Sequence, residues 1–178
     1  HCKPMMGLHP GSIKEDYKEQ LDIILKELDN PDMNYTAVGE IGIDLYWDKT
    51  FIKEQQEAFA IQIAKAKELG LPIVIHCRDA FDEVFEVLDN AYDDKLYGIF
   101  HCFTGNVEQA QRAINLNMKL GIGGVVTFKN GGLDKVMKEV DVEHLVLETD
   151  APYLAPTPVR GKRNEPAYLA NIAQKLAD

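Results

Sequence analysis

Hydrophobic and polar positions along the chain form two kinds of segment that alternate from one end to the other. Six short runs are apolar at successive positions, which is typical of parallel strands covered on both faces. These runs are residues 5–8, 37–41, 72–76, 98–101, 120–122 and 145–147. The longer segments between them repeat their apolar residues with helical spacing. The pattern therefore predicts an α/β protein built from strand-then-helix units.

Amphipathic stripes mark the predicted helices. Four stripes are evident: Tyr17, Leu21, Ile24, Leu25 and Leu28; Ile52, Phe59, Ile63 and Ala66; Phe81, Val84, Phe85 and Leu88; and Val107, Ala110, Ile114 and Met118. The second stripe ends at Leu69 and Gly70, a typical helix stop, shortly before Pro72. We expect Asn106 or Gly105 to cap the fourth helix and a last helix to begin at about Pro166.

Repeated strand–helix units fit either a doubly wound open sheet or a closed (β/α)8 TIM-type barrel. No G-x-G-x-x-G turn follows a predicted strand, and polar residues instead lie at the carboxyl ends of several strands, which favours the barrel. About six of the eight strand units are present. We therefore expect residues 1–178 to be a single hydrolase barrel domain truncated at its N-terminus, with about two more units upstream of His1.

Four potential metal ligands stand at or just beyond strand ends: Glu40, His76, His101 and Asp150. A single histidine at a strand end is more often a hydrogen-bonded structural residue than a ligand. In a barrel, however, all strand carboxyl ends open at one rim, so the four side chains are expected to converge. Two imidazoles and two carboxylates suit Zn²⁺ or Mn²⁺, and the carboxylates also suit Mg²⁺.

Composition limits the class of protein. Hydrophobic residues make up 46% and charged residues 27% of the chain, and no apolar run is long enough to span a bilayer. The N-terminus does not resemble a signal peptide, and three widely spaced cysteines fit reduced thiols, so we expect a cytoplasmic protein without membrane association. A net charge of −10 argues mildly against nucleic acid, although local arginines can still bind phosphate.

Six local motifs carry a family resemblance across nearly the whole chain. They are GLHP at 7–10, GEIGID at 39–44, IHCRDA at 75–80, HCFTG at 101–105, ETDAPYL at 148–154 and RGKRNEP at 160–166. In this order they resemble the signatures of the TatD family of metal-dependent deoxyribonucleases.

The resemblance implies a hydrolase that cleaves DNA phosphodiester bonds by metal-activated water. Two divalent ions (Mg²⁺, Mn²⁺ or Zn²⁺) would bind a complete site, with no organic cofactor. Glu40 would bridge both ions, His76 and His101 would bind one, and Asp150 would bind the other. Asp150 would also accept a proton from the attacking water, so Glu40 and Asp150 are the expected catalytic residues.

One element of the family pattern is missing. The family carries a His-x-His pair on its first strand, and none occurs in this sequence, where neither His1 nor His9 replaces it. One ion is therefore expected to be lost, and a non-catalytic metal-binding fragment is an alternative to an active enzyme. An open barrel would also expose strand edges, which favours self-association of the chain.

Basic residues near the predicted site are candidates for substrate binding. Arg78 follows a predicted ligand by two residues, and Arg160, Lys162 and Arg163 form the only dense basic cluster. We expect Arg78, Arg160 and Arg163 to bind substrate phosphate. The alternative for the cluster is a solvated loop, braced by Asn164 and Glu165. An amide- or ester-hydrolysing enzyme of the amidohydrolase type remains a second functional hypothesis.

The remaining polar residues of these motifs have less specific roles. His9 is expected to line the substrate pocket, with a structural role at the Pro10 turn as the alternative. We expect Asp44 to orient another group instead of binding metal. Cys77 and Cys102 each follow a predicted ligand histidine, but adjacent strand residues face opposite sides. Buried thiols are therefore favoured over a Cys/His zinc site.

Overall fold

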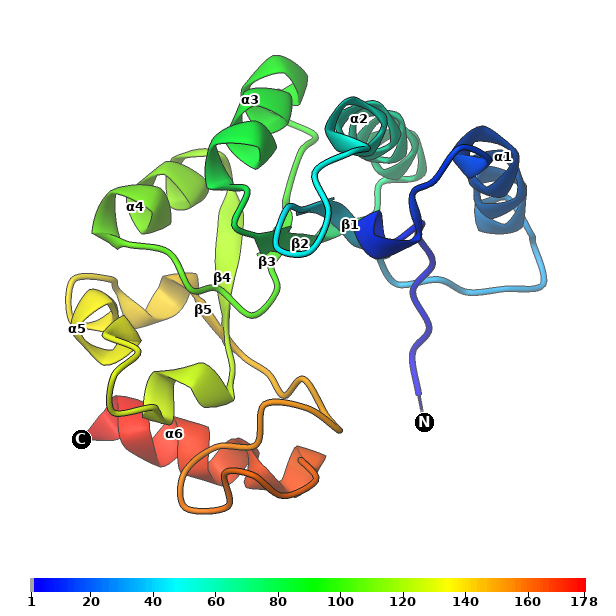
Figure 1. Cartoon of the computed structure of the whole chain (residues 1–178). Helices are drawn as coiled ribbons and strands as arrows, with labels where there is room; N and C mark the ends of the chain where they lie inside the picture. Colours follow the sequence, from blue (N-terminus) through cyan, green and yellow to red (C-terminus); the bar gives the residue numbers. More distant parts are fainter. Residues whose placement is uncertain (1) are drawn as a thin grey trace. The chain divides into compact units, whose positions relative to one another are not determined.

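The computed structural model describes residues 2–178, and these contain five strands joined mainly by helices (Figure 1). The strands are β1 (Val38–Asp44), β2 (Ile73–Arg78), β3 (Gly98–Phe100), β4 (Met118–Ile122) and β5 (Leu145–Leu147). The α-helices are α1 (Tyr17–Leu28), α2 (Ile52–Leu69), α3 (Phe81–Ala91), α4 (Val107–Asn115), α5 (Leu133–Met137) and α6 (Leu169–Ala177). Short 3-10 turns are η1 (Pro10–Ser12), η2 (Gly124–Thr127), η3 (Val142–His144) and η4 (Pro166–Tyr168).

The chain forms two compact units, which we call the N-terminal unit (residues 1–99) and the C-terminal unit (residues 100–178). In the N-terminal unit β1 pairs with β2 in parallel, and β3 begins beside β2. Fully buried aliphatic side chains form the core of this sheet: Val38, Ile41 and Ile43 on β1, and Ile73 and Ile75 on β2. Helices α2 and α3 pack on these strands (Figure 1), because their apolar stripes need cover from water.

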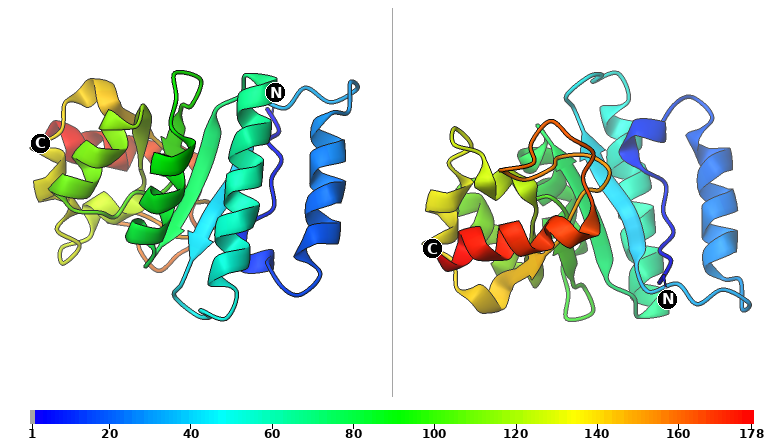
Figure 2. Two further views of the ribbon diagram at one scale, coloured as in Figure 1. Left: turned by 90° about the horizontal axis from the view of Figure 1, so that it is seen from above. Right: turned by 90° about the horizontal axis from the view of Figure 1, so that it is seen from below.

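The predicted strand at residues 5–8 does not form, and only Met6 makes an isolated parallel bridge, to Val38. Beyond Met6 the backbone of Leu8 bonds instead to the side chain of Gln62, which is buried in α2 with 1% exposure. The Leu8 N–H donates to Gln62 Oε1 at 2.6 Å and Gln62 Nε2 donates to the Leu8 carbonyl at 3.3 Å. The segment therefore runs between α1 and α2, where Leu8 joins their hydrophobic cluster (Figure 2).

The C-terminal unit contains the parallel pair β4–β5. Asn106 caps α4 as expected, because its side chain accepts from the Gln109 N–H while Gln109 bonds back to the Asn106 N–H. The last member of the predicted fourth stripe, Met118, lies outside the helix: α4 ends at Asn115 and Met118 begins β4. Asn117, at a φ of 61°, turns the chain between them. None of the helices described between residues 2 and 178 is both long and apolar enough to cross a membrane.

Candidate metal centre

A bulge in β1 presents Glu40 at the edge of the N-terminal unit's sheet. Gly39 pairs with Val74 and Ile41 pairs with Ile75, so Glu40 is the extra residue of a register shift. Such a bulge turns a side chain out of the regular alternation of a strand. Ile41 and Ile43 therefore stay in the core, while the half-buried Glu40 carboxylate comes beside a histidine of β2.

Three potential ligand atoms meet at this point. The Oε2 atom of Glu40 lies 3.7 Å from both Nδ1 of His76 and Nε2 of His9, and the two ring nitrogens are 3.3 Å apart. All three side chains are partly buried and could hold a metal ion. Ligand atoms 3.7 Å apart can both lie about 2.0–2.2 Å from one ion, which is the usual bond length for zinc to nitrogen or carboxylate oxygen.

The carboxylate of Asp44 determines which nitrogen of His76 is available to a metal. Asp44 Oδ2 lies 2.9 Å from His76 Nε2. A carboxylate accepts hydrogen bonds, so Nε2 carries the proton and Nδ1 keeps its lone pair toward Glu40. A histidine held in this way by a carboxylate is the usual arrangement behind a metal ligand. Asp44 therefore orients His76, as its position after Glu40 suggested.

His9 has the opposite arrangement of its ring nitrogens. The Gly11 N–H donates to His9 Nδ1 at 3.0 Å, so this nitrogen holds the lone pair and Nε2 carries the proton in the neutral ring. The Nε2–H can then donate to His76 Nδ1 or to an oxygen of a substrate bound next to Glu40. Hydrogen bonding therefore favours Glu40 and His76 as metal ligands and His9 as a hydrogen-bond donor at their side.

A second group of ligand atoms lies in the C-terminal unit. His101 Nδ1 lies 2.9 Å from Glu148 Oε2, and its Nε2 lies 3.6 Å from Asp150 Oδ1. The other Glu148 oxygen accepts from the Cys102 N–H at 2.5 Å. His101 is thus held through Nδ1, and Nε2 faces Asp150 with its lone pair. The arrangement resembles that of His76, which is held through Nε2 and faces Glu40 through Nδ1. In His101 the roles of the two ring nitrogens are exchanged.

Glu148 is a functional residue that the sequence analysis missed, although it belongs to a motif recognised there. It follows β5 directly, and its carboxylate lies against Gly121 of β4. A Cβ atom at position 121 would lie only 2.5 Å from Glu148 Oε2, so a glycine is needed there to admit the carboxylate. The only sign of this role in the sequence is Gly121 on the neighbouring strand. That sign can be interpreted only once β4 is known to pair with β5.

The structure thus brings the four predicted ligands together in pairs. Glu40 and His76 form one pair in the N-terminal unit, and His101 and Asp150 form the other in the C-terminal unit. A common centre for all four remains a prediction. His1, which the sequence analysis weighed as a replacement for the missing His-x-His pair, lies outside the described residues.

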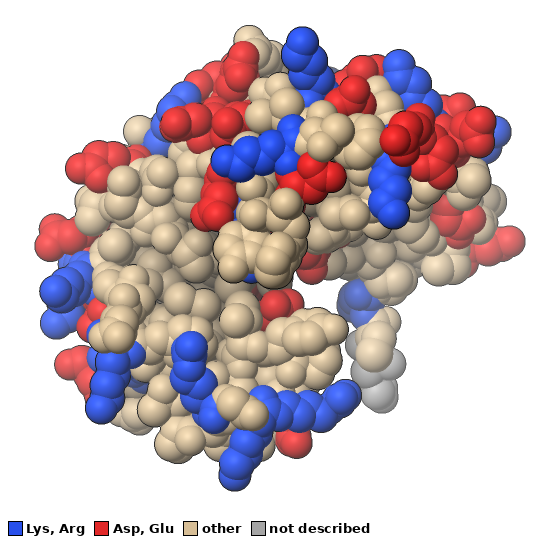
Figure 3. Space-filling view, in the orientation of Figure 1, with Lys and Arg blue, Asp and Glu red and all other residues tan. Residues whose placement is uncertain are grey.

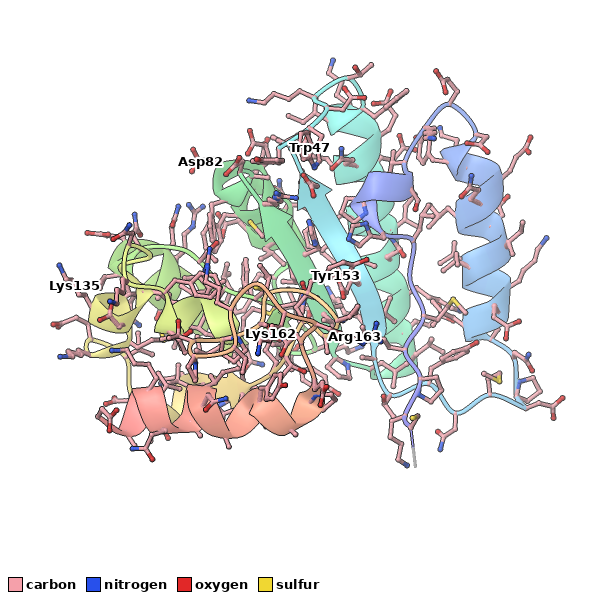
Figure 4. All side chains as sticks on the ribbon, turned by 60° about the horizontal axis from the view of Figure 1, so that its bottom comes forward. Trp47, Asp82, Lys135, Tyr153, Lys162 and Arg163 are labelled. Carbon is pink, nitrogen blue, oxygen red and sulfur yellow. The ribbon has the colours of Figure 1, made fainter. Side chains whose placement is uncertain are left out.

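Two of the three predicted substrate-binding arginines lie on aromatic rings. The Arg78 guanidinium carbon is 3.7 Å from the centroid of Tyr46, and that of Arg160 is 3.5 Å from the centroid of Phe128. Arg163 is exposed on the segment before α6, together with Lys162 and Tyr153 (Figure 4). Lys and Arg side chains gather over this segment and α6, whereas both signs mix over α2 and α3 (Figure 3).

Asn164 braces the segment that bears this basic cluster. It is 2% exposed and its Nδ2 donates to the Tyr153 carbonyl at 2.7 Å. Its backbone N–H donates to the Pro152 carbonyl, and its Oδ1 accepts from the Glu165 N–H. The bracing role suggested for Asn164 by sequence therefore has a defined set of partners, which fix the loop that follows Asp150.

The cysteines next to the histidines do not resemble a zinc site. Burial raises the pKa of the Cys77 thiol to about 12, which keeps it protonated and a poor metal ligand at neutral pH. Cys102 differs from the expectation in its backbone, because β3 ends at Phe100 and Cys102 lies in a turn with a φ of 46°. Strand alternation therefore does not apply to Cys102. All three cysteines are free thiols.

Comparison with known proteins identifies the family of the chain. The sequence matches the family described as TatD related DNase over residues 1–178. It is 44% identical over 174 residues to the uncharacterized metal-dependent hydrolase YabD of Bacillus subtilis, covering 97% of this chain and 68% of that protein. It is 36% identical over 183 residues to the 3'-5' ssDNA/RNA exonuclease TatD of Salmonella typhimurium, covering 99% of this chain and 70% of that protein.

A solved structure gives the same result for the fold. The crystal structure of YJJV, a TatD homologue from Escherichia coli, superposes with a TM-score of 0.91 at 30% identity, covering 98% of this chain and 68% of that one. The predicted fold class is thereby confirmed, with five strands in place of the six expected within the described residues. This chain belongs to the TatD family of metal-dependent hydrolases.

Proposed function

We propose that the protein is a divalent-metal-dependent phosphodiesterase that cleaves single-stranded DNA. One observation carries the proposal: each unit holds a histidine that is fixed by one carboxylate and faces a second carboxylate. The fixing carboxylates are Asp44 for His76 and Glu148 for His101. The facing carboxylates are Glu40 at 3.7 Å and Asp150 at 3.6 Å. A histidine held by a carboxylate in this way is the usual arrangement at metal sites.

The donor set fits divalent cations. Glu40 with His76, and His101 with Asp150, would hold them. Divalent cations bound there would lower the pKa of a water molecule and stabilise negative charge on phosphate oxygens. The thiol next to His76, that of Cys77, stays protonated and is therefore a poor nucleophile.

The side chains around the ligands then have distinct tasks. Asp150 is 35% exposed at its side chain and can accept the proton of the attacking water. His9, with its proton on Nε2, can donate to an oxygen of the bound phosphate. Arg78, two residues after His76, offers a planar set of donors that matches phosphate oxygens.

The choice of nucleic acid as substrate has two supports. A relative at 36% identity is named as an exonuclease of single-stranded DNA and RNA. The basic cluster of Arg160, Lys162 and Arg163 gives an otherwise acidic chain a local positive surface after Asp150. Local charge at the site matters more for a phosphodiester than the net charge of −10.

Activity on DNA is the direct test. The chain should shorten a single-stranded oligonucleotide with Mg²⁺ or Mn²⁺ and not with EDTA. Glu40→Ala should lower the rate by about 100-fold or more, because ligand loss exceeds the 10- to 100-fold effect of a residue behind a ligand. Glu19→Ala, on the exposed face of α1, is the matched control. Equal rates for the parent and Glu40→Ala would contradict the proposal.

The same experiment separates the alternatives. Hydrolysis of p-nitrophenyl acetate or an anilide, without cleavage of DNA, would favour the amide- or ester-hydrolase hypothesis. Metal binding by calorimetry without turnover of any substrate would favour a non-catalytic metal-binding chain. Self-association and a cytoplasmic location remain predictions, and light scattering that finds only a monomer would contradict the first.

A further inference from the structure

A pocket of about 390 Å³ opens in the N-terminal unit, between η1 and the loop that joins β1 to α2. Its walls include Ile13 near η1, Trp47 and Phe51 from the loop, and Gln55 from α2. Asp44, which orients His76, belongs to the same wall. The volume lies within the range of small-molecule sites in proteins, and it exceeds what a single side chain would fill.

Trp47 is the most unusual component of this pocket. Its side chain is 82% exposed, and it is the single tryptophan of the sequence. The Tyr46 ring stands against it edge to face, with the centroids 4.6 Å apart and the planes at 87°. Figure 4 places Trp47 at the loop just beyond the carboxyl end of β1. A large aromatic face held at a pocket mouth in this way is suited to stacking on a flat ligand.

A cation lies beside the same aromatic pair. The guanidinium of Arg78 packs on the Tyr46 ring at 3.7 Å. In this stacked position the N–H groups of the guanidinium point outward in its plane and can donate to a phosphate. Aromatic side chains combined with arginine are the usual means by which proteins bind single-stranded nucleic acid.

The aromatic pair is connected to the candidate metal ligand His76 through Asp44. Asp44 Oδ1 accepts from the Tyr46 N–H at 3.0 Å, while its other oxygen lies 2.9 Å from His76 Nε2. The Leu45 N–H also donates to the Arg78 carbonyl at 2.9 Å. A ligand stacked on Trp47 would therefore lie next to the candidate metal centre in the N-terminal unit.

Charge decides which part of a nucleotide enters the pocket. Its lining contains the acidic residues Glu15, Asp44 and Asp48 against the single basic residue Lys14. This excess of negative charge disfavours a phosphate inside, whereas an uncharged base meets no such repulsion. Arg78 lies outside the lining and is available for the phosphate.

We propose that this pocket takes an unpaired nucleobase of a single-stranded nucleic acid, stacked on Trp47, with the adjoining phosphate bound by Arg78. The link to cleavage rests on the proposed nuclease function, but the binding itself does not. The site would explain a preference for single strands, because a base in a duplex is already stacked and paired.

Trp47 emission gives a specific readout, because no other tryptophan contributes. The chain is titrated in EDTA, where no cleavage occurs, with a single-stranded oligothymidylate, an oligouridylate, an abasic strand of the same length and charge as these two, and a duplex of the same length. We expect both base-bearing single strands to quench the emission to saturation, and their relative affinities to report a DNA or RNA preference. The abasic strand and the duplex should quench little.

Substitutions separate the base from the phosphate. By fluorescence anisotropy with a labelled oligothymidylate, Trp47→Ala should weaken binding roughly 5- to 150-fold, the range for loss of one stacked base, and Trp47→Phe should restore most of it. Binding of the abasic strand should not respond to Trp47→Ala. Arg78→Gln should weaken both strands alike and reduce the dependence of affinity on salt. Tyr92→Ala, an exposed tyrosine at the end of α3, is the control.

The failures of the two proposals are distinguishable. Equal titrations with the abasic and base-bearing strands, or no loss of affinity in Trp47→Ala, would overturn the base pocket even if the protein cleaves DNA. Absence of metal-dependent cleavage, together with base-dependent quenching, would overturn the nuclease function and leave the pocket supported.

Discussion

The carboxylate of Asp44 lies 2.9 Å from Nε2 of His76 and also accepts, through its other oxygen, from the Tyr46 N–H. One side chain thereby fixes the ring of a candidate metal ligand and the start of the loop that carries Tyr46 and Trp47. Because the proton stays on Nε2, the Nδ1 lone pair is directed toward Glu40.

Removing this carboxylate should loosen the metal site without removing a ligand. We expect Asp44→Ala to lower the affinity for Mn²⁺ or Zn²⁺ by about 10- to 100-fold, the usual effect of losing the group behind a ligand histidine. Isothermal titration calorimetry measures the change. Asp82→Ala, exposed in the first turn of α3, should bind metal as the parent does. An unchanged affinity in Asp44→Ala would contradict the orientation of His76 inferred from the hydrogen bond.

His9 and His76 should respond differently to substitution, although their ring nitrogens are only 3.3 Å apart. His76→Ala removes a ligand and should abolish measurable binding of metal in the N-terminal unit. His9→Ala removes a donor and should leave metal affinity within about 3-fold of the parent, while KM for an oligonucleotide rises by about 5- to 10-fold, the loss of one hydrogen bond. Equal losses of metal affinity in the two variants would make His9 a ligand after all.

Sequence pattern predicted the parts of this molecule that depend on burial. The aliphatic residues Val38, Ile41, Ile73 and Ile75 of the apolar runs became buried core. Glu40 and His76 came together because β1 and β2 are parallel neighbours, although β1 continues to Asp44 and Glu40 lies in a bulge instead of at the strand end. The cap at Asn106 was predictable because it needs only residues three apart. These features follow from local spacing and from strand order.

Features that depend on one distant side chain were not predictable in the same way. Gln62 bonds to the backbone of Leu8 from 54 positions away, at the end of the segment 5–8 that the apolar pattern favoured as a strand. Glu148 reaches His101 and Cys102 only because Gly121 leaves room on the neighbouring strand. The bulge at Glu40 depends on pairing with β2. Such contacts are properties of the packed fold, so spacing in the sequence does not reveal them.

Glu148 should matter for both stability and metal binding. Its carboxylate accepts from the Cys102 N–H and contacts His101 Nδ1, with only 17% of the side chain exposed. Glu148→Ala removes the acceptor that these two partly buried groups share, and we expect it to lower the free energy of unfolding by roughly 2–3 kcal/mol. Urea denaturation measures this loss. Glu143→Ala, 75% exposed at its side chain, should change stability by less than about 0.5 kcal/mol.

Asn164 offers a test of the loop that follows Asp150. Asn164→Ala leaves the Tyr153 carbonyl and the Glu165 N–H unpaired, so we expect a loss of about 1–3 kcal/mol in the free energy of unfolding. The loop carrying Arg163 should also become more sensitive to trypsin. Asn90→Ala, on the exposed side of α3, removes a single solvent-accessible hydrogen bond and serves as the control. Trypsin cleavage at the parent's rate would mean that the loop is held by other contacts.

Cys77 provides a prediction about pH. Burial raises the pKa of its thiol to about 12, whereas the pKa of a cysteine thiol in the unfolded chain is about 8.5. Because the pKa is higher in the folded state than in the unfolded chain, the un-ionised Cys77 thiol contributes fully to stability below about pH 8.5. This contribution is lost as the pH rises toward 12. Native protein at pH 8 should therefore react with iodoacetamide at the exposed Cys2 and not at Cys77, as peptide mass spectrometry would report. Cys77→Ala should flatten the alkaline decline in stability, and labelling of Cys77 as fast as Cys2 would disprove its burial as an un-ionised thiol.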